Sequence, residues 1–95
     1  MGNALEIPIY NKVRQWCQDY GRPDVSDQHG AKDFIECETK ESIRSLQVEL
    51  IAMADGRFDE KRLDNILGAR RRVKYGSYVE WAKMMLRWLG EAKGV

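Results

Sequence analysis

The sequence predicts an all-α domain: a small four-helix bundle that contains a central αα-hairpin and a long irregular connection after its first helix. Apolar residues recur at the helical period in four segments, and residues that cap helices stand next to these segments. The chain has 95 residues, of which 43% are hydrophobic and 33% charged, as suits a soluble chain with one core. Residues 1–95 are therefore expected to form a single helical domain.

The first predicted helix spans residues 8–20. Its apolar side chains fall within an arc of roughly 120° at 100° per residue, and they are Ile9, Tyr10, Val13, Trp16, Cys17 and Tyr20. Pro8 suits a first helical position, and Gly21 followed by Pro23 supplies the stop. Turn-forming residues interrupt the periodicity from residue 22 to residue 38, so an irregular connection is expected there.

Two further helices are expected in the middle of the chain. Periodicity returns at residues 40–54, with Thr39 as the N-cap. An Asp-Gly pair ends this helix, and Asp59 caps the next one, at residues 60–72. So short a link predicts an αα-hairpin with antiparallel packing.

The helix at residues 60–72 contains one conflict. A regular helix places Arg70 on the same face as the apolar Ile66 and Leu67. Three outcomes remain open: the arginine stem lies along the apolar surface with its head in water, the helix frays near Gly68, or an acidic side chain meets the arginine.

The last predicted helix, at residues 78–89, begins with a capping box of Ser77 and Glu80 and stops at Gly90. Its apolar arc of roughly 220° exceeds what one core face needs. One side of this arc is aromatic and rich in methionine: Tyr78, Trp81, Met84, Met85 and Trp88. Two interpretations stay open. The helix is the centre of the bundle, or its aromatic side binds a protein partner or a second copy, since such residues are enriched in interfaces.

The net charge of +1 conceals two halves of opposite sign. Residues 24–55 carry eight acidic and three basic side chains, whereas residues 57–95 carry ten basic and five acidic ones. Recognition of the acidic half of one copy by the basic half of another would explain this split.

Within the basic half, cations stand next to an aromatic residue: Arg70, Arg71, Arg72, Lys74 and Tyr75. Cations beside aromatic rings can hold phosphates and stack bases, so a nucleic-acid-binding regulator is the alternative function. The other interpretation is a solvated helix end, where cations are favoured near the last carbonyl groups.

Motifs for catalysis or metal binding do not stand out. A glycine-rich phosphate loop, a Gly-x-Ser-x-Gly elbow and a His-Glu-x-x-His motif are all lacking. Cys17, Cys37 and His29 are fewer than the four ligands that a structural zinc site needs. We expect no catalytic site, no metal and no cofactor.

The leading hypothesis is a small non-catalytic protein-interaction or regulatory module, with a homodimer as one form of it. The first ten residues lack a basic start, a long apolar run and a small-residue cleavage site. A cytoplasmic protein with reduced cysteines and no membrane association is therefore expected.

Overall fold

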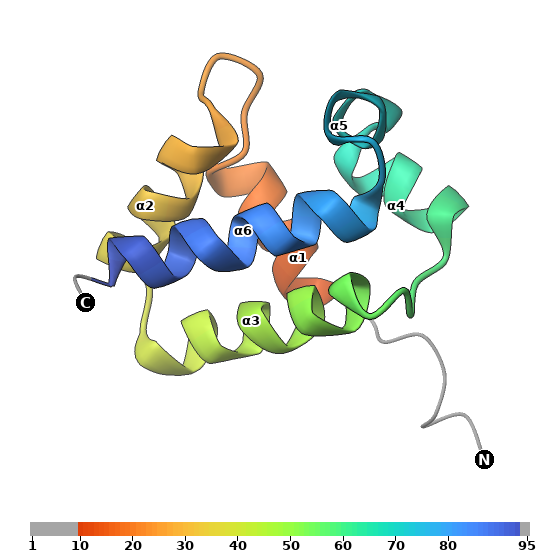
Figure 1. Ribbon diagram of the computed structural model, residues 1–95. Coiled ribbons are helices and arrows are strands. Elements are labelled where there is room, and N and C mark those ends of the chain that lie inside the picture. The colour runs from red at the N-terminus through yellow and green to blue at the C-terminus, as the bar shows by residue number, and fades with distance from the viewer. Residues whose placement is uncertain (1–9, 94–95) are drawn as a thin grey trace.

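The computed structural model describes residues 10–93, and this part of the chain forms six helices and no strand (Figure 1). The helices are α1 (Asn11–Asp19), α2 (Asp27–Cys37), α3 (Lys40–Ala54), α4 (Glu60–Leu67), α5 (Ala69–Tyr75) and α6 (Tyr78–Ala92). The predicted small all-α fold is confirmed. The predicted number of four helices is wrong, because one helix was missed and another is divided.

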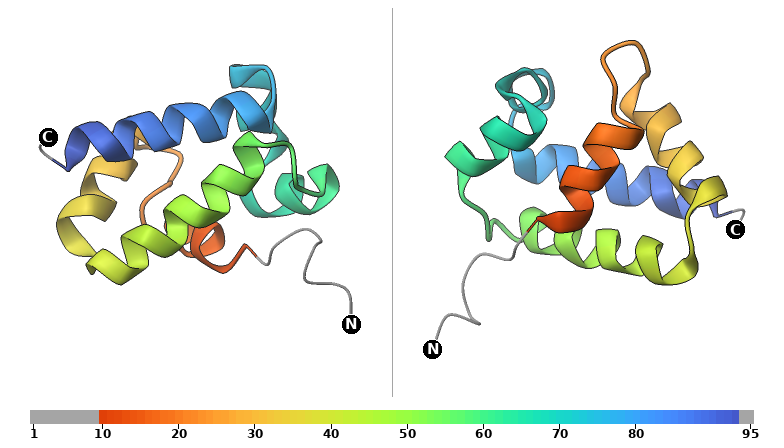
Figure 2. Two further views of the ribbon diagram at one scale, coloured as in Figure 1. Left: turned by 60° about the horizontal axis from the view of Figure 1, so that its bottom comes forward. Right: turned by 180° about the vertical axis from the view of Figure 1, so that it is seen from behind.

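Helix α6 lies at the centre of the fold and packs against α2, α3 and α5. Helices α3 and α6 run side by side in opposite directions, with α2 at one end of α6 and the α4–α5 pair at the other (Figures 1 and 2). Helix α1 packs against α3 and α4. The broad apolar arc of the last helix is therefore largely covered by the chain itself, as the central-helix interpretation requires.

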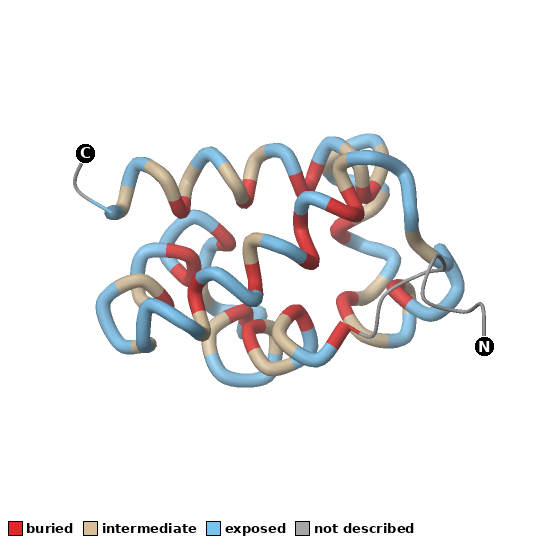
Figure 3. The backbone as a smooth tube through the Cα atoms, turned by 90° about the horizontal axis from the view of Figure 1, so that it is seen from below, coloured by how far each residue is buried: buried red, intermediate tan, exposed pale blue. Residues whose placement is uncertain are grey.

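The core is built from large aromatic and aliphatic side chains. The buried positions recur along the helices, on the sides that face the other helices (Figure 3). Its largest fully buried members are Trp16, Trp81, Tyr10, Tyr78 and Phe34. The Trp16 and Trp81 rings meet edge to face, with centroids 5.8 Å apart. Burying one large apolar side chain contributes about 1.5–3 kcal/mol, so this cluster is the main source of stability.

The predicted N-caps of α3, α4 and α6 are confirmed. The side chains of Thr39, Asp59 and Ser77 each accept a backbone N–H from the first turn of their helix. The predicted stop at Gly90 is wrong, because Gly90 lacks the positive φ of a helix-ending glycine and α6 continues to Ala92.

Helix α1 has no capping side chain of its own. The Glu49 carboxylate of α3 takes this role, because it accepts the backbone N–H groups of Lys12 and Val13 at 2.9–3.1 Å. A negative charge at a helix N-terminus is favourable. The predicted start of this helix at Pro8 and Ile9 lies outside the described residues.

Residues 22–38 are mostly helical, so the predicted irregular connection is wrong. Ser26 caps α2 by accepting the backbone N–H of His29 at 3.1 Å. Gly30, which suggested a turn, lies inside the helix because the chain passes too close for a side chain: a Cβ there would lie 2.6 Å from the Tyr20 carbonyl oxygen. The irregular part shrinks to residues 20–26.

The predicted helix at residues 60–72 is interrupted at Gly68, which has a φ of +89°. This conformation is unfavourable for other residues, so α4 ends there and α5 starts in a new direction. Of the three outcomes for the arginine conflict, the helix break is the one observed. The break turns Arg71 inward instead of Arg70, and Arg71 then meets an acidic partner.

The predicted central αα-hairpin is wrong. Helix α3 packs on α6 and α1, whereas α4 packs on α5 and α1. The link is also anchored to other elements: the Tyr10 hydroxyl donates to the Arg57 carbonyl at 3.1 Å, and the Phe58 ring meets Tyr78 of α6 edge to face, with centroids 5.9 Å apart. These contacts direct α4 toward the start of α6.

Candidate functional site

The predicted aromatic interface on α6 is wrong for three of its five residues. Tyr78, Trp81 and Met85 are fully buried in the core of their own chain. They therefore offer no surface to another molecule in the folded state. Met84 and Trp88 are partly exposed and remain as candidates.

The buried polar groups of this face have partners inside the chain. The Tyr78 hydroxyl donates to Asp64 at 2.6 Å, and the Trp81 indole N–H donates to Asp27 at 2.9 Å. Burial, together with the hydrogen bond to Asp64, raises the pKa of Tyr78 well above its usual range. Both side chains thus have structural roles that the helical spacing alone did not reveal.

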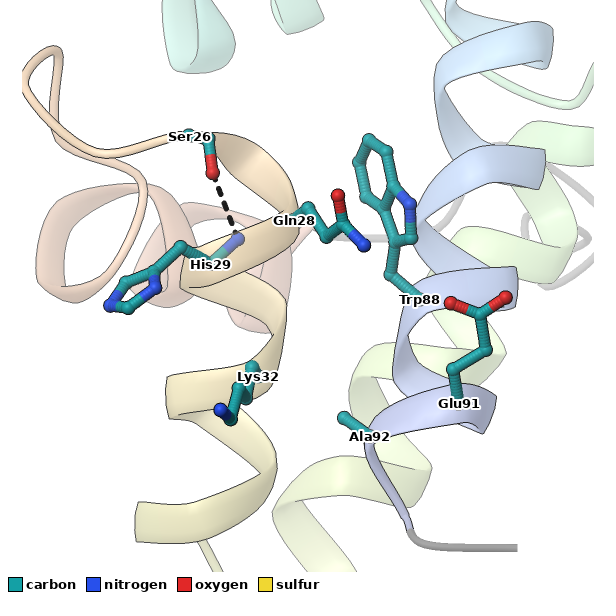
Figure 4. Close-up of a pocket in the computed structure, with 7 residues that line it drawn as sticks. All are labelled: Ser26, Gln28, His29, Lys32, Trp88, Glu91 and Ala92. Carbon is teal, nitrogen blue, oxygen red and sulfur yellow. Dashed lines mark hydrogen bonds between the residues drawn. The ribbon is translucent and has the colours of Figure 1, made fainter.

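Trp88 lies in the wall of an open groove between α2 and α6, with a volume of about 500 Å³. We call this the Trp88 groove, and its lining residues are Ser26, Gln28, His29, Lys32, Trp88, Glu91 and Ala92 (Figure 4). The Gln28 side chain points toward the indole, whereas the His29 imidazole points away from it (Figure 4). The groove thus combines one large aromatic surface with a polar rim.

The indole is held in place from one side. Its ring meets Tyr75 edge to face, with centroids 6.3 Å apart. Met84, one helical turn before Trp88, lies on the same side of α6 and is also partly exposed. An anchored, partly exposed tryptophan is suited to contact with a partner, because little side-chain freedom is lost on binding.

The two walls of the groove carry opposite charges. Lys32 on α2 supplies an ammonium group that has no carboxylate partner among residues 10–93. Glu91 on α6 supplies a carboxylate that pairs with Arg87 at 3.2 Å on an exposed surface. A cation and an anion therefore flank the aromatic surface.

The break at Gly68 divides the predicted basic cluster into two cations with acidic partners and two exposed ones. Arg71 is buried at 7% exposure. Arg72 points back to α4, where it pairs with Asp64 at 3.1 Å and Glu60 at 3.0 Å. The remaining cations, Arg70 and Lys74, are exposed.

The Tyr75 ring is also occupied. One side of it meets the Lys74 ammonium, 5.4 Å from the ring centroid, and it pairs with Trp88 as well. The five residues predicted to bind nucleic acid therefore do not form one surface.

Arg71 and Asp27 form a buried pair that the sequence reasoning missed. The guanidinium donates to both carboxylate oxygens of Asp27 at 2.9 Å, and to the carbonyl groups of Gly21 and Leu67 at 2.8 and 2.7 Å. It also lies 5.5 Å from the ring centroid of Trp16. Burial alone would lower the pKa of Arg71, but the hydrogen bond and charge of Asp27 outweigh it and raise the pKa.

A signal for the missed residues was present in the sequence. Asp27, Ala31 and Phe34 recur at the spacing of a helix face, and a serine stands before the first of them. Asp27 and Gly30 on the inner side of the helix interrupt this apolar pattern, so the helix was not predicted. For the same reason, the α2 wall of the Trp88 groove was not predicted.

The described residues contain few groups suited to chemistry. Within residues 10–93, no three side chains of His, Cys, Asp and Glu are grouped so that they could hold a metal ion. Cys17 and Cys37 are not bonded to each other; burial raises the pKa of Cys17, while Cys37 is exposed. His29, at the rim of the groove, pairs with Asp33 at 3.4 Å.

None of the helices within the described range is both long enough and apolar enough to cross a membrane. The features that distinguish this chain are thus the Trp88 groove and the buried Arg71–Asp27 pair. The chain matches no protein-family model, no curated protein and no solved structure with which it was compared.

Proposed function

We propose that this chain is a small non-catalytic protein-interaction module that self-associates, with the Trp88 groove of one copy receiving the outer face of α3 of another. The observation that carries the proposal is the partly exposed indole in the wall of a groove of about 500 Å³. Tryptophan and tyrosine are enriched at the centres of protein interfaces, where they fill or form pockets. A concave surface of this kind needs a convex apolar occupant.

The outer face of α3 provides such an occupant. Val48 and Ile51 are 60% and 48% exposed, whereas most large apolar side chains of the described residues are buried. The two are three positions apart on one helix and are therefore neighbours on its surface. Together they form a small apolar ridge.

The ridge, like the groove, has one cation and one anion beside its apolar surface. Arg44 lies one turn before Val48 and Asp55 one turn after Ile51, so the ridge has a cation at one end and an anion at the other. In the groove, Glu91 and Lys32 lie on opposite walls. The intrachain ion pairs of the two acids are exposed and contribute little, so an intermolecular pairing can replace them.

The groove and the ridge are different surfaces of one chain, so their pairing is head to tail. The contact is small and contains one aromatic anchor. Interfaces below about 1,200 Å² are generally weak and transient, so we expect reversible association that increases with concentration.

Sedimentation velocity over a range of protein concentrations tests the proposal. The wild-type chain should show an average mass that rises with concentration. Trp88→Ala should weaken the association about 30-fold, which corresponds to about 2 kcal/mol for an aromatic anchor. Val73→Ala is the matched control, because Val73 is 73% exposed on α5 and belongs to neither surface.

Both variants are first checked for folding by circular dichroism and urea unfolding. A wild-type chain that stays monomeric at millimolar concentration contradicts the proposal. The proposal is also contradicted if Val73→Ala weakens the association as much as Trp88→Ala does, because the loss would then not be specific to the groove.

A further inference from the structure

We propose that a second surface of this chain, distinct from the interaction surface above, binds a multiply charged phosphate group such as pyrophosphate. The site is a pocket of about 340 Å³ between α5 and the loop that precedes α2. We call it the Arg22 pocket, and its lining residues are Arg22, Pro23, Asp24, Val25, Ser26, Asp27, Arg70, Arg71 and Lys74. The loop and α5 rise on the same side of α6 (Figure 1).

The pocket has a clear excess of positive charge. Four cations and two carboxylates line it, which gives a net charge of +2. Arg71 and Asp27 neutralise each other through two hydrogen bonds of 2.9 Å. Three cations remain against one acid, Asp24.

These three cations are Arg22, Arg70 and Lys74. All three are exposed, and none has a carboxylate partner within 4.0 Å among residues 10–93. They come from segments about fifty positions apart in the chain, and only the folded structure brings them together. Arginine forks and a lysine ammonium are the side chains that most often bind phosphate oxygens.

The buried pair gives the pocket a fixed base. Arg71 lies on α5, and it bonds the Gly21 carbonyl and the Asp27 carboxylate on either side of the loop. Its Nε and both Nη atoms already have partners, so Arg71 positions the pocket and is not free to bind the ligand itself. The loop that carries Arg22 is thereby held against the helix that carries the other two cations.

The geometry favours a small anion over a nucleic-acid strand. Binding of a single strand combines a charged groove with aromatic rings on which bases stack. Tyr75, the nearest candidate ring, is engaged by Lys74 and Trp88, and Arg72 is turned toward α4. A pocket of about 340 Å³ is within the size range of small-ligand sites, about 300–1,000 Å³.

Isothermal titration calorimetry of the full chain with pyrophosphate, at low ionic strength, tests this inference. The wild-type chain should bind pyrophosphate with a stoichiometry of one. The double variant R22A/R70A should weaken binding by about tenfold or more, because hydrogen bonds to charged groups are lost. Both side chains are exposed, so their removal leaves the core intact.

The matched control is K61A/R62A. These two cations are exposed on α4 and line neither the Arg22 pocket nor the Trp88 groove, and their removal lowers the net charge by the same amount. Pyrophosphate affinity should stay within about twofold of wild type in this control, apart from the general effect of charge.

Three results would overturn the inference: no heat of binding with pyrophosphate, equal weakening by both double variants, or tight binding of a 20-nucleotide oligo(dT) without binding of pyrophosphate. The last result would replace the small-anion site with a nucleic-acid surface. None of these results depends on Trp88, so the inference and the proposed self-association fail independently.

Discussion

Replacing Arg71 with methionine tests how the fold is held together at the junction of α5 with the rest of the chain. Methionine keeps much of the volume of the arginine stem but removes the guanidinium. The change leaves the Asp27 carboxylate, which is only 8% exposed, with the Trp81 indole N–H as its remaining side-chain donor. It also removes the donors to the carbonyl groups of Gly21 and Leu67.

The expected loss is large for a single side chain. Removing one partner of a buried ion pair destabilises a protein by about 3–5 kcal/mol, because the other charge stays buried without compensation. A domain of this size has a total stability of about 5–15 kcal/mol. Arg71→Met should therefore remove about a fifth or more of the free energy of unfolding.

Urea unfolding at pH 7, followed by circular dichroism, measures the loss. The matched control is Arg70→Met, which makes the same chemical change one position earlier at an exposed residue. The control should change the free energy of unfolding by no more than about 0.5 kcal/mol. The double variant D27N/R71M should recover part of the stability, with a coupling energy of about 1–3 kcal/mol between the two sites.

A loss below about 1 kcal/mol for Arg71→Met would refute the reasoning, because the buried pair would then contribute no more than an exposed one. Equal losses for the variants at positions 70 and 71 would refute it as well. Equal losses would mean that the lower stability comes from a changed helix propensity of α5 and not from loss of the Arg71–Asp27 pair.

Other predictions concern a buried acid, a helix glycine and the exposed indole. Burial, which outweighs hydrogen bonds from α1 amides, raises the pKa of Glu49, so the folded state holds its proton up to a higher pH than the unfolded state does. The stability of wild type relative to Glu49→Gln should therefore fall as pH rises from 4 to 8, and a rise in urea-unfolding experiments would contradict this. Gly30→Ala should cost about 1–3 kcal/mol, because its Cβ would lie 2.6 Å from the Tyr20 carbonyl oxygen. Gly90→Ala, with nothing within 4 Å of the Cβ, should stabilise α6 by about 0.5–1 kcal/mol. A Gly30→Ala variant that melts at a higher temperature than the Gly90→Ala variant would contradict both estimates. Acrylamide should quench the fluorescence of Trp88 in the monomer but hardly affect that of Trp16 and Trp81, which are 0% exposed. If acrylamide still quenched the fluorescence strongly in the Trp88→Phe variant, the burial of these two tryptophans would be contradicted.

Helix periodicity was enough to predict most of the fold. Helix α3 was predicted with its bounds, and α6 with its start, because apolar spacing and a capping side chain indicate the same segment. Helix α2 was not predicted because its inner side includes Asp27 and Gly30. Contacts with residues elsewhere in the chain explain why both are buried there: Asp27 pairs with Arg71, and Gly30 lies against the carbonyl group of Tyr20.

The candidate sites were harder to predict for a related reason. Spacing placed Trp81 and Trp88 on one side of the last helix, but it could not show that α2 and α3 cover most of that side. Likewise, the run of basic residues suggested one cluster, but the break at Gly68 turns Arg71 to Asp27 and Arg72 to α4 and leaves the other two cations exposed. Which side chain stays exposed depends on tertiary contacts that a single helix pattern does not contain.

Mixing two complementary variants tests the central claim of head-to-tail association through the Trp88 groove most directly. Trp88→Ala removes the anchor of the groove but leaves the ridge on α3, whereas the double variant V48D/I51D removes the ridge but leaves the groove. Each variant alone should sediment as a monomer. An equimolar mixture should form a dimer and nothing larger, because it contains one intact groove and one intact ridge. A mixture that stays monomeric, under conditions where the wild-type chain associates, would contradict the claim.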